Sequence, residues 1–62
     1  PLDLNSQETI VLGALSHEPI DMHSLIQKTA LSISELQATL TILELKGLAK
    51  NIGSMQYMKI HS

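Results

Sequence analysis

The amino-acid sequence predicts a mostly α-helical domain that ends in a small β-hairpin. Three segments carry apolar residues at helical spacing, and each follows a residue type that can cap a helix. After Gly47 the pattern changes to that of two short strands joined at a Gly53-Ser54 turn. A chain of 62 residues forms one domain with a thin core, because it buries only about 60% of its unfolded surface.

The composition is that of a globular domain rather than a disordered or membrane segment. Hydrophobic residues make up 44% of the chain, and no apolar run approaches the roughly 18 residues that a membrane span needs. The absence of Cys excludes disulfides and thiolate metal sites and is compatible with a reducing compartment, so we expect a cytoplasmic protein. Because the chain begins with Pro1 rather than Met, we expect residues 1–62 to be a single-domain fragment of a longer protein.

The first helix is expected from about Ser6 to Leu15. Asn5 or Ser6 can cap it, and Glu8 in the first turn suits the positive end of the helix dipole. The helix should end before Pro19, which disfavours helical geometry in the residue that precedes it. One helical face collects four apolar residues, namely Ile10, Val11, Ala14 and Leu15.

The second helix is expected from Met22 to Thr29, after Asp21 as its N-cap. Its apolar contacts are Met22, Leu25 and Ile26. The Pro19-Ile20 pair before this helix is too short for an independent strand but can add a brief edge pairing.

The third helix is expected from Ile33 to Lys46. Ser32 and Glu35 have the spacing of a capping box, in which each side chain satisfies a backbone donor at the helix start. Gly47 supplies the left-handed residue that commonly ends a helix. We expect the hairpin to cover Leu45, and we expect a core stripe made of Ile33, Leu36, Leu40 and Leu43.

The two strands are expected at about residues 48–52 and 55–60. Tyr57 and Lys59 should lie on one side of the second strand, and Gln56, Met58 and Ile60 on the other. A lone hairpin is marginal in water, so this one must pack on the helices. Two helices joined by a tight turn and followed by such a hairpin predict a winged helix-turn-helix with a two- or three-stranded antiparallel wing.

The residues show no convergent catalytic set, and we expect neither an enzyme nor a cofactor site. The three glycines are too far apart for a phosphate-binding loop. A cluster of possible metal ligands follows the first helix, but a polar loop with Asp21 as a helix cap is the preferred interpretation; the cluster consists of His17, Glu18, Asp21 and His23.

The sequence also resembles a known family over about Ser6 to Ile60. The matching features are Glu18-Pro19 after Leu15, Leu31-Ser32 before the third helix, the stretch LELKGL, and a tyrosine after a glycine turn. With these features the chain is similar to the C-terminal winged-helix domain of the DNA-processing protein A family, also called Smf, of bacterial natural transformation. The resemblance implies a non-enzymatic accessory module beside a Rossmann-like domain that binds single-stranded DNA and helps load the recombinase RecA.

A role in DNA binding is the first hypothesis for such a module. The helix face beside the core stripe, with Ser34, Gln37 and Thr41, is the one that enters the major groove in this fold. The net charge is −2, and residues 31–45 contain no Lys, Arg or His, so we expect weak, salt-sensitive binding of duplex DNA. The candidate contacts are Ser32, Ser34, Gln37, Thr41, Lys50 and Lys59.

Protein docking is the second hypothesis, and a transcriptional regulator remains an alternative because fold does not fix function. Ile42 lies nearly opposite the core stripe of the third helix and has no evident cover. With Met55 or Met58 it is expected to form an exposed apolar patch of the kind that marks partner surfaces. The partner would be the Rossmann-like domain, a recombinase or a second copy of the chain.

Overall fold

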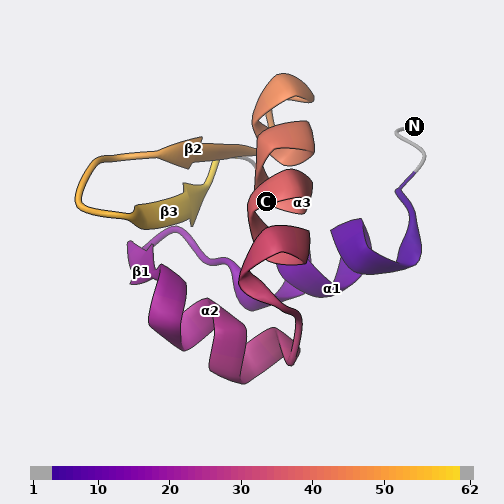
Figure 1. Ribbon diagram of the computed structural model, residues 1–62. Coiled ribbons are helices and arrows are strands. Elements are labelled where there is room, and N and C mark those ends of the chain that lie inside the picture. The colour runs from indigo at the N-terminus through magenta and orange to yellow at the C-terminus, as the bar shows by residue number, and fades with distance from the viewer. Residues whose placement is uncertain (1–3, 61–62) are drawn as a thin grey trace.

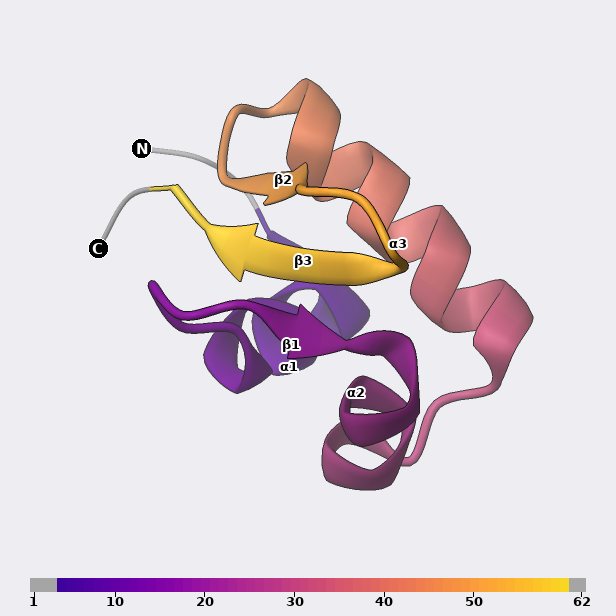
Figure 2. The ribbon, with the colours of Figure 1, turned by 90° about the vertical axis from the view of Figure 1, so that its left-hand side faces the viewer.

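The computed structural model describes residues 4–60, which form three helices and a three-stranded antiparallel sheet. Figure 2 shows the sheet in front of α1, with α2 below it and α3 along the right-hand edge of the molecule. This arrangement is the predicted winged helix-turn-helix. The elements in chain order (Figure 1) are α1 (Ser6–Ala14), β1 (Ile20–Asp21), α2 (Met22–Thr29), α3 (Ile33–Leu45), β2 (Ala49–Asn51) and β3 (Gln56–Lys59).

Two of the helices start with reciprocal capping boxes. At α3, Ser32 Oγ accepts a hydrogen bond from the Glu35 backbone N–H at 3.1 Å, and Glu35 Oε1 accepts from the Ser32 N–H at 3.0 Å. At α1, Asn5 and Glu8 make the equivalent pair, with distances of 2.8 and 3.2 Å. The capping box predicted for α3 is therefore confirmed, and Asn5 rather than Ser6 caps α1.

The helix ends are defined by backbone conformation. Gly47 has a φ of 77°, its N–H donates to Glu44 O, and the Leu48 N–H donates to Leu43 O. These bonds form the Schellman motif, which confirms Gly47 as the residue that ends α3. At the start of α2, Asp21 takes the N-cap position without a side-chain cap, because its Oδ1 accepts instead from Ser24 Oγ at 2.8 Å.

The sheet has the strand order β1-β3-β2. Ile20 pairs with Tyr57, which confirms the expected edge pairing before α2 and makes β3 the central strand. The strands are shorter than expected because the β2–β3 connection takes up Ile52 to Met55. Its turn is closed by a 3.0 Å bond from the Gln56 N–H to Gly53 O, and the Met55 carbonyl accepts from the Met22 N–H at 3.1 Å. This last bond ties the wing turn to the start of α2.

The core lies between the three helices and the inner face of the sheet. Tyr57 packs against it from β3, together with Ile20 from β1. Leu36, Leu40 and Leu43 of the predicted stripe are buried. The full set of buried hydrophobic residues is Val11, Leu15, Met22, Leu25, Leu36, Leu40, Leu43 and Ala49.

Three apolar residues do not take the places that the pattern predicts. Ile10 is 46% exposed, because α1 turns Glu8 and Val11 inward instead. Ile33 is 48% exposed, because the first residue of α3 lies at the margin of the core. Leu45 is 84% exposed rather than covered by the hairpin, because after Gly47 the chain turns to the opposite side of α3 and inserts Ala49 there.

Candidate interaction surfaces

The side of α3 opposite its buried leucines carries no charged residue. Successive helix positions are about 100° apart, so the residues opposite the buried Leu36, Leu40 and Leu43 form one face. Glu35 and Glu44 lie at its two edges. Leu45, one of its members, is the most exposed large hydrophobic residue of the described part of the chain. We call this surface the outward face of α3; it consists of Ser34, Gln37, Ala38, Thr41, Ile42 and Leu45, all exposed.

The hydroxyl groups expected to contact DNA are partly occupied by the helix itself. Thr41 Oγ1 donates a 2.9 Å hydrogen bond to the Gln37 carbonyl of the preceding turn. Ser32 Oγ accepts from the Glu35 N–H and so holds the start of α3. Ser34 and Gln37 are exposed on the outward face, as the helical spacing predicts. The face therefore offers few polar groups and no cation for a phosphate backbone.

The two wing lysines lie on opposite faces of the sheet. Lys59 pairs with the buried Ala49, whereas Lys50 pairs with Met58. Directly paired residues point to the same face and successive residues alternate, so Lys59 points to the helix side and Lys50 to the outer side. Lys50 is exposed and Lys59 is half-buried. The two ammonium groups therefore do not form one basic wing surface, although sequence reasoning grouped them.

An ion pair between α1 and α3 was not predicted. Lys46 Nζ lies 2.8 Å from Glu8 Oε1, and the Glu8 residue is only 4% exposed. The hydrogen bond from Lys46 lowers the pKa of Glu8, with smaller help from the Asn5 backbone N–H and against the opposing effect of burial. The pair is 38 residues apart in sequence, so no local pattern indicates it. Lys46 is thus engaged with Glu8 at the end of α3.

A second contact joins the same two helices nearer the start of α3. Gln7 Nε2 donates to Glu35 Oε2 at 3.1 Å, and Thr39 Oγ1 lies 3.4 Å from Gln7 Oε1. Thr39 is 3% exposed, and its hydroxyl also donates to the Glu35 carbonyl at 2.7 Å. These bonds place α1 along one edge of α3, and Ile42 lies on the neighbouring turn at that edge.

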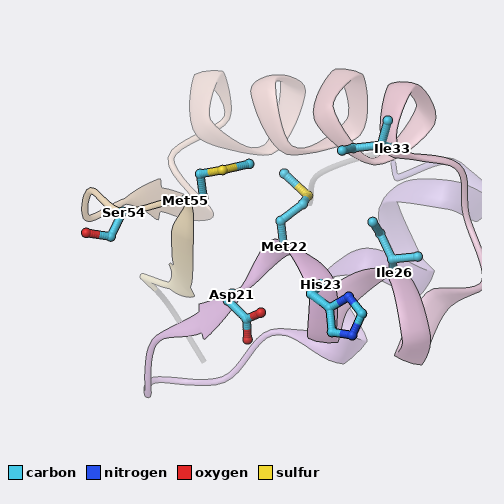
Figure 3. A pocket seen from close by; sticks show the side chains of 7 residues that line it. All are labelled: Asp21, Met22, His23, Ile26, Ile33, Ser54 and Met55. Carbon is cyan, nitrogen blue, oxygen red and sulfur yellow. The ribbon is translucent and has the colours of Figure 1, made fainter.

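A pocket of about 400 Å³ opens between the wing turn and the starts of α2 and α3. In Figure 3 the side chains of Met55, Met22 and Ile33 point toward one another across it, while the His23 ring points away. The lining residues are Asp21, Met22, His23, Ile26, Ile33, Ser54 and Met55. Sequence reasoning did not find this pocket, because it depends on the tie between Met55 and Met22.

The three residues expected to form one apolar patch lie on separate surfaces. Met55 is 56% exposed and sits with Ile33 in the pocket. Met58 lies beside Lys50 on the outer face of the sheet. Ile42 is 38% exposed and lies half a helical turn away from Ile33 around the axis of α3. The structure therefore groups Ile42 with Leu45 and separates it from both methionines.

The polar residues after α1 make contacts of their own. Asp21 accepts a hydrogen bond from Ser24, which lowers the pKa of Asp21. His23 Nε2 lies 3.3 Å from Gln27 Nε2. Within residues 4–60, no three His, Cys, Asp or Glu side chains come close enough to hold a metal ion. None of the helices in that range is long and apolar enough to span a membrane.

The family model of the DprA winged helix domain matches residues 1–52, which is most of the 62-residue chain. No curated protein and no solved structure matches the chain significantly. The matched region includes all three helices, the β1 pairing segment and the second strand, β2. The chain therefore belongs to the DprA winged helix domain family.

Proposed function

We propose that this domain is a non-enzymatic protein-docking module of a DprA-type DNA-processing protein that acts in natural transformation. The observation that carries the proposal is the outward face of α3, which is uncharged and exposes Leu45 at 84%. In a winged helix this is the surface that would read the major groove. Here it has the composition of a protein contact, because charged residues are depleted at the centres of such interfaces.

The energetics favour a protein partner over DNA at this face. Burying a leucine side chain fully is worth about 1.5–3 kcal/mol, and Ile42 adds further apolar area next to Leu45. DNA affinity comes mainly from cations that neutralise phosphates, and Lys46, which directly follows α3, is bonded to Glu8. Glu35 at the start of α3 would also repel phosphates. The candidate partners are the Rossmann-like domain, a recombinase and a second copy of the chain.

A lysine at position 45 tests the docking proposal. Leu45→Lys puts a charge at the centre of the outward face, and we expect it to weaken association at least ten-fold. Association is measured by calorimetric titration with the purified Rossmann-like domain of the same protein and by sedimentation of the chain alone. The matched control is Ile10→Lys, which makes the same type of change at an exposed position on α1. Equal association by both variants and the native chain would refute the proposal.

Weak duplex binding is the second candidate function, favoured by the joint exposure of Ser34, Gln37 and Thr41 on the outward face. Gln can pair with adenine in the major groove, and Lys50 on the outer sheet face can reach a phosphate. With one or two phosphate contacts the salt dependence would be shallow. A titration with duplex DNA at low salt tests this function, and loss of binding in Gln37→Ala but not in Ile10→Lys would support it.

A further inference from the structure

We infer that Met55 is a modification site for hydrogen peroxide, and that oxidation of its thioether releases the wing turn from the start of α2. The modification is independent of the docking proposed for the outward face of α3. Solvent access separates Met55 from the other two methionines. Met55 is 56% exposed, whereas Met22 is 5% exposed and Met58 is half-buried. Because methionine oxidation follows the access of the oxidant to sulfur, Met55 should react first.

The reaction transfers one oxygen atom from hydrogen peroxide to the Met55 sulfur. The S–O bond forms as the O–O bond breaks, the sulfur loses two electrons to the peroxide, and the remainder of the peroxide leaves as water. The product is a methionine sulfoxide. Its oxygen accepts hydrogen bonds, so a flexible apolar side chain becomes a polar one.

The position of Met55 gives this change of polarity a structural consequence. Its side chain forms one wall of the pocket between the wing turn and the starts of α2 and α3. In Figure 3 it points toward Met22 and Ile33. A polar group placed against apolar side chains without a hydrogen-bond partner costs free energy. The sulfoxide should therefore turn outward to water, and the apolar contact of Met55 with the pocket is then lost.

The backbone of the wing turn is sensitive to the loss of this contact. Ser54 and Met55 have φ values of 54° and 58°, a left-handed conformation that is unfavourable for L-residues and persists only where the surroundings hold it. The Met22 N–H donates to the Met55 carbonyl at 3.1 Å and so joins the turn to α2. Without the side-chain contact, the turn should open at this hydrogen bond more often.

Met58 provides an internal comparison, because it carries the same thioether three residues further along the chain. It pairs with Lys50 on the outer face of the sheet, away from the pocket. A sulfoxide on that face can remain hydrated. Oxidation of Met58 should therefore leave the wing turn in place.

Peptide mapping of the chain during treatment with hydrogen peroxide tests the assignment of the site. Trypsin cleaves after Lys50 and Lys59 and so releases Met55 and Met58 in one peptide, in which fragmentation in the mass spectrometer locates the added oxygen. Met55 should be oxidised about ten-fold faster than Met22 and several-fold faster than Met58. The same reaction in urea provides the rates for the unfolded chain, in which all three methionines are accessible.

Hydrogen exchange of the Met22 amide, followed by NMR, tests the release of the wing turn. Exchange should become about ten-fold faster after oxidation of Met55, because the acceptor of this N–H moves away. Met55→Leu has a side chain of similar volume that peroxide does not oxidise, so its Met22 exchange should not respond. The matched control is Met58→Leu, which should respond like the native chain. Treatment with a methionine sulfoxide reductase should restore slow exchange.

Three results would overturn the inference. Oxidation of Met55 no faster than that of Met58 would contradict the assignment of the site. Unchanged exchange of the Met22 amide after complete oxidation of Met55 would contradict the release of the turn. An equal response of Met55→Leu and the native chain to peroxide would assign the effect to another residue.

Discussion

Ala30 holds a left-handed backbone conformation at the end of α2, with φ 61° and ψ 20°. An L-residue in this region costs about 1–2 kcal/mol, and glycine avoids that cost while losing about 0.5–1 kcal/mol of chain entropy. Ala30→Gly should therefore stabilise the domain by about 0.5–1 kcal/mol. Ala38→Gly makes the same change inside α3 and should destabilise it by about 1 kcal/mol. Urea unfolding of both variants measures the opposite signs.

Glu8 should make the stability of the domain depend on pH. Its pKa is held below the ordinary value of 4.5, chiefly by the hydrogen bond from Lys46. A carboxyl with a lowered folded pKa stabilises the fold above its unfolded pKa and loses that contribution as the pH falls through the folded pKa. Glu8→Gln should therefore be less stable than the native chain at pH 7, and the difference should shrink as the pH falls below 4.5.

Chemical denaturation at pH 7 and pH 3 measures this difference. The control is Glu18→Gln, which removes a carboxylate from an exposed position in the loop after α1. A difference between the native chain and Glu8→Gln that is unchanged at pH 3 would contradict the role of the ion pair. The sequence could not predict this role, because a glutamate in the first turn of a helix is equally well explained by the helix dipole.

At the scale of elements, the start of α3 separates a structural serine from an exposed one. Ser32 caps the helix through the Glu35 N–H, whereas Ser34 lies on the outward face. Ser32→Ala should destabilise the domain by about 1 kcal/mol, and Ser34→Ala should be close to neutral because alanine favours helix. Thermal unfolding followed by circular dichroism compares them. Equal melting temperatures would show that the capping box contributes nothing.

The helices could be predicted because their signals are local. The capping box of Ser32 and Glu35, the stop at Gly47 and the period of Leu36, Leu40 and Leu43 all act within a few residues. The faces of the sheet could not be predicted. Tyr57 and Lys59 share a side, as alternation requires, but placing Lys50 needs the register of β2 against β3, which the turn sets.

The wing turn is a second feature that the sequence predicts only in part. Ser54 and Met55 both have positive φ, 54° and 58°, as a type I′ turn requires. Such turns favour Asn-Gly at their two central positions. The Gly53-Ser54 pair therefore locates the hairpin, but the central residues of the turn are Ser54 and Met55, one position further along the chain. This turn also determines which surface Met55 joins, because it directs the Met55 side chain toward Ile33 instead of Ile42.

At the scale of the whole molecule, the fold follows from the order of its elements, and the family match agrees with it. Which side chains can contact a partner depends on their solvent exposure, and that exposure depends on how the helices and strands pack. The sequence predicts that the hairpin covers Leu45, which lies off the core stripe of α3, but the path of the chain after Gly47 leaves it 84% exposed. The scaffold is one used for DNA recognition, whereas the outward face of its α3 carries no charged residue and exposes Leu45.

The central claim is that this domain has a fold used for DNA recognition but lacks the cations that DNA binding needs. The affinity of the chain for duplex DNA tests that claim most directly. Fluorescence anisotropy with a 20-base-pair duplex would be followed from low to physiological salt. With at most one or two phosphate contacts, we predict binding weaker than about 100 μM and a slope of log K against log salt shallower than about −2. Low-micromolar binding with a slope near −5 or steeper would contradict the account, because it would require a basic surface that α3 and the wing do not provide.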